Sequence, residues 1–189
     1  MPIKQLLPLI APPLAPLDNE GVWRASELVV GAKYPADFRA LIEQYGSGAF
    51  FQGYLTVYNP LTIGGLAWIK DVERVFRPKR ERLYPLPLPV HPDTPGLLFW
   101  GGDDNGNHYA WLTKGKPDKW PVVFLGHGSE SHPIELRTDI TGFLAGYAMD
   151  QFEQLVQPGN PVTEEMRVFT PGRNQGEVAR ALFQARKGR

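Results

Sequence analysis

Cysteine is missing from the 189 residues of this sequence, and so is an excess of charge of either sign. Without cysteine the chain cannot form a disulfide, a thiolate nucleophile or a cysteine-based zinc site, and a cytoplasmic location is expected. The 20 lysine and arginine residues balance 20 aspartate and glutamate residues, so no long-range field draws the protein to nucleic acid or to an anionic membrane. We therefore expect a local patch to recognise any partner, without direct binding to nucleic acid.

Long hydrophobic runs are also missing. The 19 prolines and 20 glycines recur throughout the chain, whereas a membrane-spanning helix needs about 18 or more consecutive apolar residues. The apolar opening 1–17 has the composition of a secretory leader, but prolines interrupt it and Lys4 supplies its only positive charge. We therefore expect a soluble protein with neither a membrane span nor a leader of this kind.

The sequence does contain enough apolar volume for one core, because 42% of the residues are hydrophobic and 12% are aromatic. We expect three parts: a proline-rich N-terminal arm over 1–21, a domain over 22–156, and a C-terminal extension over 157–189 that carries a short helix. Proline fixes φ and removes an amide donor, so the arm is predicted to be extended backbone that lies across the domain.

Several stretches have the apolar spacing of amphipathic helices. Over 35–45, apolar residues from Phe38 to Tyr45 recur at three- and four-residue intervals, while Pro35 suits the first turn of a helix and Gly46 its end. Further helices are predicted over 66–76, from a cap at Thr138 or Asp139 through Ala148, and over 175–187.

Aromatic and β-branched runs predict the strands. One strand is expected over 49–58. Runs over 97–100 and 108–112 flank Asn105-Gly106, a pair that tolerates the positive φ of a hairpin turn. Two further strands are predicted, over 120–125 and 132–136. The fold class is therefore α+β, an antiparallel β-sheet flanked by α-helices.

Four motifs follow one another within this order of elements. The stretch YPADFR at 34–39 leads to YGSG at 45–48, and the hairpin carries WGGDDNGN at 100–107. A strand that starts WPVV at 120–123 and a closing helix with Phe143-Leu144 follow. Over about 22–149, this pattern resembles the SUKH superfamily, which includes the yeast cell-wall assembly regulator and many bacterial toxin-immunity proteins.

The resemblance implies an antiparallel sheet flanked by helices, no catalytic residues and no cofactor. In bacteria it also implies a small cytoplasmic protein that binds and blocks a cognate toxin. The motif residues themselves suit architecture: Gly46 and Gly48 permit a turn, Pro35 starts a helix, and Trp100 and Phe143 are expected to fill the core. The resemblance therefore indicates a scaffold and leaves the binding residues open.

Two polar clusters suggest chemistry of other kinds. Asp103, Asp104 and Asn107 could bind calcium, but counting from Asp103 puts glycine at position four and lysine at position twelve of an EF-hand loop, so a solvated hairpin turn is preferred. His127 and His132 offer two ligands where zinc hydrolases use three. A metal-dependent hydrolase built on their loop is the third hypothesis, and no metal or other cofactor is expected.

The leading hypothesis is a non-enzymatic immunity protein that binds a cognate protein toxin, such as a nuclease or a deaminase, and covers its active surface. The basic cleft of such a toxin attracts carboxylates, and an exposed tryptophan beside charge is typical of interface hot spots, so Trp120 is expected to be partly exposed. The alternative is a regulatory adaptor with the same fold. The candidate partner contacts are Asp103, Asp104, Asn107, Trp120 and Glu130.

Overall fold

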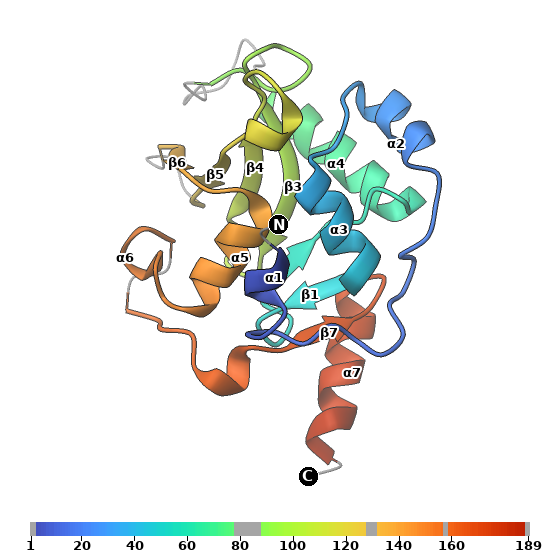
Figure 1. Ribbon diagram of the computed structural model, residues 1–189, viewed down its shortest axis with the longest axis vertical. Coiled ribbons are helices and arrows are strands. Elements are labelled where there is room, and N and C mark those ends of the chain that lie inside the picture. Colours follow the sequence, from blue (N-terminus) through green and yellow to red (C-terminus); the bar gives the residue numbers. More distant parts are fainter. Residues whose placement is uncertain (1–2, 78–87, 128–131, 157–158, 188–189) are drawn as a thin grey trace.

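An antiparallel sheet forms the centre of the structure, a computed structural model that describes residues 3–77, 88–127, 132–156 and 159–187 (Figure 1). Seven strands of the described residues lie side by side in the order β6-β5-β4-β3-β2-β1-β7. Their bounds are β1 Gly48–Phe50, β2 Leu55–Val57, β3 Leu97–Asp103, β4 His108–Leu112, β5 Val122–Leu125, β6 Ile134–Leu136 and β7 Phe169–Pro171. The predicted α+β class, with a sheet flanked by helices, is confirmed.

Helices cover both faces of this sheet (Figure 1). Helices α1, α3 and α5 pack together on one face, and α4 packs on the opposite face over β3. The helices are α1 Ile3–Leu6, α2 Trp23–Val30, α3 Ala36–Tyr45, α4 Ile63–Phe76, α5 Ile140–Ala148, α6 Glu153–Val156 and α7 Gln175–Lys187, with 3₁₀ turns η1 Pro117–Lys119 and η2 Glu164–Met166. None of the helices in the described ranges has both the length and the apolar content that crossing a bilayer requires.

Strand β3 divides the interior into two cores because its successive side chains point to opposite faces. Leu98 and Trp100 belong to the main core beneath α1, α3 and α5, whereas Leu97 and Phe99 belong to a smaller core beneath α4. Trp100 and Phe143 are both fully buried and pack with their ring centroids 6.0 Å apart, as the sequence predicted for these two residues. All seven residues of β3 are buried.

The end signals of the helices act as the sequence predicted. Helix α3 begins directly after Pro35 and ends at Gly46, which has φ +70°. An added Cβ on Gly46 would lie 2.1 Å from the backbone oxygen of Leu17, so this position has room only for glycine. Helix α5 begins after Asp139, whose Oδ1 accepts a hydrogen bond of 2.7 Å from the N–H of Gly142. Helix α7 has the predicted bounds.

The prediction of one strand over 49–58 is wrong. The chain pairs with itself there as β1 and β2, in an antiparallel hairpin that reverses between Phe50 and Leu55. Phe51 and Gln52 adopt positive φ angles of 58° and 56°, a conformation that non-glycine residues seldom take, and Gly53 follows at 91°. Phe51 is nevertheless buried and packs on Tyr147, so a core contact holds this unusual turn.

The two flanking segments are part of the folded body. Residues 3–6 form a helix where extended backbone was predicted, and Leu6 and Ile10 are completely buried in the main core. At the other flank, β7 pairs antiparallel with β1, at an edge of the described sheet. A strand there was not predicted from the sequence.

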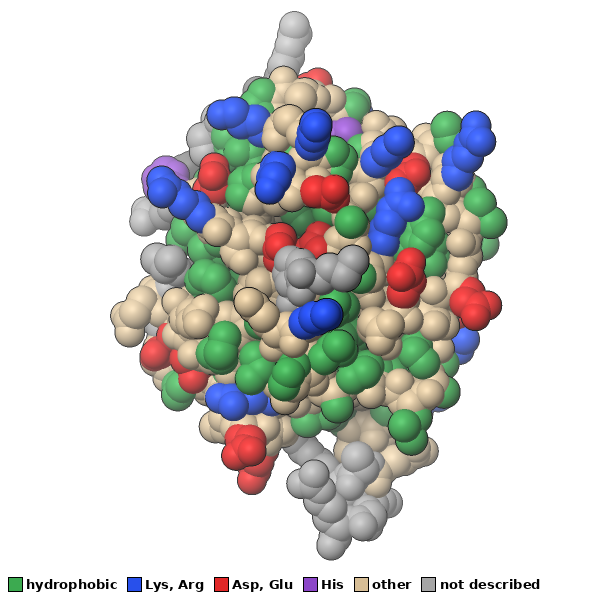
Figure 2. Space-filling view, viewed as in Figure 1, with side chains coloured by type: hydrophobic (Ala, Val, Ile, Leu, Met, Phe, Trp, Pro, Cys, Tyr) green, Lys and Arg blue, Asp and Glu red, His purple; other side chains and the backbone are tan. Residues whose placement is uncertain are grey.

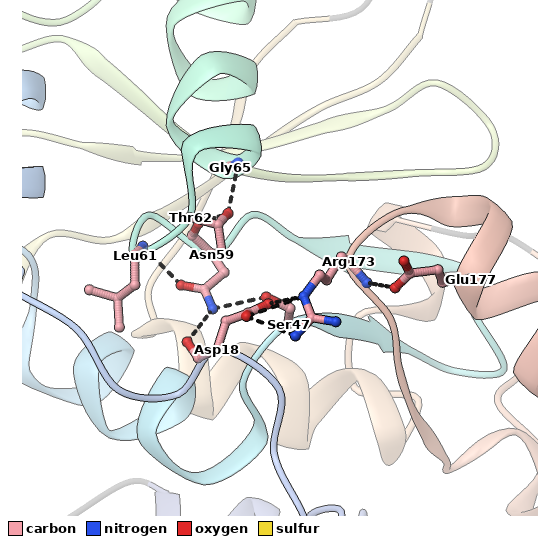
Figure 3. A network of polar contacts seen from close by, with 8 residues as sticks. All are labelled: Asp18, Ser47, Asn59, Leu61, Thr62, Gly65, Arg173 and Glu177. Atoms are coloured by element: carbon pink, nitrogen blue, oxygen red, sulfur yellow. Dashed lines mark hydrogen bonds and ion pairs between the residues drawn. The ribbon is translucent and has the colours of Figure 1, made fainter.

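A polar network joins these two flanks to the middle of the chain (Figure 3). The side-chain amide of Asn59 donates to the backbone oxygen of Asp18 at 2.9 Å and to the hydroxyl of Ser47 at 3.0 Å. The carboxylate of Asp18 in turn pairs with the guanidinium of Arg173, with 3.1 Å between Oδ2 and Nε. The N-terminal arm, the turn before β1, the segment before α4 and the C-terminal extension therefore meet at one point.

Candidate interaction surfaces

The tip of the β3–β4 hairpin is held by the carboxylate of Asp103. Its Oδ1 accepts hydrogen bonds of 3.0 Å from the N–H groups of Asn105 and Asn107. Its Oδ2 accepts from the side-chain amide of Asn107 at 2.9 Å and from the hydroxyl of Tyr109 at 2.8 Å. Asp103 is only 9% exposed, so within the predicted hairpin turn it is a buried group, whereas residues 104–106 are exposed. A carboxylate with this many donors serves to fix the turn.

Asp104 is the carboxylate that the hairpin tip exposes to solvent. Burial of part of the group raises its pKa above the ordinary range, and the neighbouring charge of Asp103 raises it further. Asn105 beside it is exposed and donates to the hydroxyl of Tyr54 at 3.0 Å. Asn107 is half-buried and accepts a hydrogen bond of 2.7 Å from the N–H of His127. The hairpin tip, residues 104–107, is thus a small acidic and amide-rich surface on a fixed frame.

Trp120 lies at the other end of β4, away from the hairpin tip. It directly follows η1, is 7% exposed, and donates from Nε1 to the backbone oxygen of Gly115 at 3.2 Å. The prediction that Trp120 is partly exposed is therefore wrong, because its ring packs against Trp111 in the main core. The structure brings Asp103, Asp104 and Asn107 together and separates them from Trp120. Glu130 lies outside the described residues.

A wide depression opens beside Trp120, between η1, β6 and the start of α5, and has a volume of about 820 Å³. Figure 2 shows a hollow on this face of the molecule, with Lys and Arg side chains gathered along its upper side. Three of the lining residues are the exposed cations Lys114, Lys119 and Arg137. Sequence reasoning missed this set, since the three residues lie up to 23 positions apart (137 − 114) and follow no common motif.

Three carboxylates on this face bind the ends of helices. Asp118 accepts from the N–H of Ala36 at 2.7 Å at the start of α3. Asp139 caps α5, and Asp37 accepts from the N–H of Thr141 in the first turn of the same helix at 3.3 Å. Burial, together with the charge of Asp139, raises the pKa of Asp37 to about 6. Asp37 and Asp139 form an acidic pair. One oxygen of each carboxylate accepts a hydrogen bond from a backbone N–H group in the first turn of α5.

A family model named SUKH_6 and described as SMI1-KNR4 cell-wall matches residues 21–144. The chain belongs to the SUKH family. Searches of curated proteins and of solved structures returned no match. The hairpin tip and the depression's three cations all lie within the matched stretch of this SUKH protein, whereas Asp18 and Arg173 of the polar network lie outside it.

In the ranges that the structure describes, no three histidine, aspartate or glutamate side chains are grouped so that they could hold a metal ion. His127 and His132 flank residues 128–131, which lie outside the described ranges. His108 packs against Phe76 and Phe99, and its burial lowers its pKa, which favours the neutral ring. Among the described residues, the hairpin tip and the depression both combine exposed charged side chains with groups that can form hydrogen bonds.

Proposed function

We propose that this SUKH protein is a non-enzymatic, cytoplasmic binding module that neutralises a protein toxin by docking on it with the hairpin tip. The observation that carries the proposal is the fixed presentation of Asp104 and the neighbouring amides by the buried carboxylate of Asp103. Because the frame is formed before binding, little conformational entropy is lost when the tip is covered by a partner. Membership of the SUKH family also supports a binding module that has no catalytic activity.

The charge of the tip suggests which kind of toxin surface it fits. A toxin that acts on nucleic acid needs a cationic substrate cleft, because phosphates dominate the affinity for nucleic acids. An exposed carboxylate on a protruding hairpin complements such a cleft and accelerates encounter through electrostatic steering. Covering the cleft would block access of the substrate without any chemistry by the SUKH protein.

The experiment combines protection with kinetics. A candidate toxin gene that adjoins this gene is expressed with and without this protein, and the growth of the two strains is compared. Asp104→Lys should lower the association rate constant for the toxin by about tenfold or more at low salt, since the steering charge is reversed. Glu43→Lys is the matched control, because Glu43 is an exposed carboxylate on α3 and lies outside the hairpin tip. Asp103 is unsuitable for this test because its replacement would disturb the turn itself.

Two results would count against the proposal. One is that wild-type protein, Asp104→Lys and Glu43→Lys protect cells equally well and associate with the toxin equally fast. The other is binding to a host protein without any protection from the toxin, which would favour the regulatory adaptor. Salt dependence distinguishes steering from a packing effect, because the difference between the variants should shrink as the ionic strength rises.

A further inference from the structure

We infer that the cavity between the start of α4, strands β1 and β2 and the start of α7 binds a small molecule that carries a phosphate monoester. The cavity has a volume of about 390 Å³, which is within the usual range for small-ligand sites. It goes beyond the proposed function, because it requires no protein partner. Its lining includes Arg173 and Asn174, which lie outside the stretch that matches the SUKH family model. The site therefore depends on the C-terminal extension.

Among the described residues, the lining of this cavity contains one cation and no carboxylate. The cation is Arg173, whose Nε lies 3.1 Å from Oδ2 of Asp18 (Figure 3). Asp18 does not itself line the cavity, but its charge offsets that of Arg173. Attraction of an anion must therefore come mainly from hydrogen-bond donors that face no carboxylate in the lining.

The first turn of α4 supplies a backbone donor to the cavity. N–H groups in the first turn of a helix have no acceptor within the helix, and here Oγ1 of Thr62 accepts that of Gly65 at 3.0 Å. No described group accepts from the N–H of Gly64, which also lines the cavity. A Cβ added to Gly64 would meet no atom within 4 Å. A ligand can thus reach this N–H, where the helix dipole favours negative charge.

A buried hydroxyl in the same cavity has an unused donor. Ser47 is only 5% exposed and belongs to the lining. Its Oγ accepts a hydrogen bond of 3.0 Å from the side-chain amide of Asn59, but within the described ranges it donates to no group. A hydroxyl carries one donor besides its lone pairs, and buried donors normally have a partner. An oxygen atom of a ligand would complete the hydrogen bonding of Ser47.

This set of donors suits a phosphate monoester, which carries three terminal oxygens and close to two negative charges. The organic part of the ligand fits beside the aromatic side chains of the lining. There Trp68 stacks on Tyr58 with 13° between the ring planes, and Val57 adds apolar surface. Burial, together with the charges of Asp103 and Asp104, raises the pKa of Tyr58. These carboxylates disfavour an anion beside Tyr58, so the phosphate group is expected at the start of α4.

The experiment uses the full-length protein and phenyl phosphate, a monoester with an aromatic group. Binding is measured by isothermal titration calorimetry at about 50 mM salt, where charges are weakly screened. Gly64→Glu should weaken binding by about tenfold or more, because its carboxylate repels the phosphate group at the start of α4. Gly64→Gln adds a side chain of the same size without the charge and should weaken binding by less than about threefold.

Two further variants locate the site. Ile63→Glu is a matched control, because Ile63 is 90% exposed in the same turn of α4 and does not line the cavity, and it should change affinity by less than about threefold. Ser47→Ala removes the buried donor and should weaken binding by about tenfold. Thermal unfolding of all the variants confirms that they fold.

The outcomes separate the proposal from general electrostatic attraction. Three results would overturn the inference. The first is no binding of phenyl phosphate to the wild-type protein at about 5 mM ligand, and the second is an equal loss of affinity in Gly64→Glu and Ile63→Glu. The third is binding of inorganic phosphate or of benzoate at least as tight as that of phenyl phosphate, which would contradict a monoester site. Since Gly64→Glu leaves the hairpin tip unaltered, this site and the proposed docking surface can fail independently.

Discussion

The ionised carboxylate of Asp37 lowers the stability of the folded protein. Its carboxyl group lies in the first turn of α3, and burial with the nearby charge of Asp139 raises its pKa from 3.8 to about 6. The folded protein therefore binds a proton more tightly than the unfolded chain does. By linkage, this group favours folding at low pH, and its contribution is lost as pH rises from about 4 to about 6.

We predict that Asp37→Asn increases the free energy of unfolding at neutral pH by roughly 1–2 kcal/mol, and changes it little near pH 4. The side-chain oxygen of asparagine can still accept from the N–H of Thr141. Urea denaturation across this pH range measures the effect, with Asp118→Asn as a control because Asp118 is exposed. If the free energy of unfolding depends on pH in the same way in Asp37→Asn and in the wild type, the pKa of Asp37 is not raised in the folded protein.

Strand β7 shows at the scale of elements that the C-terminal extension supports the sheet. Phe169 packs its ring between those of Phe50 and Tyr45, with centroid distances of 4.8 and 5.2 Å. We predict that Phe169→Ala lowers the free energy of unfolding by about 3–5 kcal/mol, the usual cost of removing a buried phenyl ring. Val168→Ala, at the neighbouring 43% exposed position, should cost less than about 0.5 kcal/mol. Chemical denaturation measures both variants, and an equal loss of unfolding free energy in the two would contradict the packing of Phe169 against Phe50 and Tyr45.

Elements whose signals are local were predictable, and those held by distant contacts were not. Asp139 begins α5 and Gly46 ends α3 through interactions within one helical turn, so both roles could be predicted from the sequence. The reversal at Phe51 depends on packing against Tyr147, far along the chain. Helix α2 was not predicted from the sequence; in the structure Val30 is buried while Leu28 and Val29 are exposed.

The candidate surfaces follow the same division. Asp104 and Asn107 are close in sequence across a recognisable turn, so their proximity in the hairpin tip was predictable. The burial of Asp103 was not, because it depends on the hydroxyl of Tyr109 in the next strand. The separation of Trp120 from the hairpin tip follows from the predicted antiparallel order of the strands, because Trp120 precedes β5, which starts beside the end of β4.

For the whole molecule, a net charge of zero is compatible with local groups of charged side chains. The exposed carboxylate of Asp104 lies at the hairpin tip, whereas the depression at the other end of β4 is lined by three cations and three carboxylates. Composition alone could exclude a uniform field but could not detect this arrangement.

Burial of β3 on both faces has a kinetic consequence for its backbone. Strand β4 pairs along one edge of β3, and the other edge is bonded to β2 over 101–103 and to residues 89–91 at Leu97, so solvent reaches its amides only when much of the sheet opens. In hydrogen–deuterium exchange, peptides from 97–103 should therefore take up deuterium last, and peptides from α7 among the first. Equally fast labelling of both segments would contradict this order. Mass spectrometry of the exchanged protein would thus map how the sheet comes apart, beginning away from its central strand.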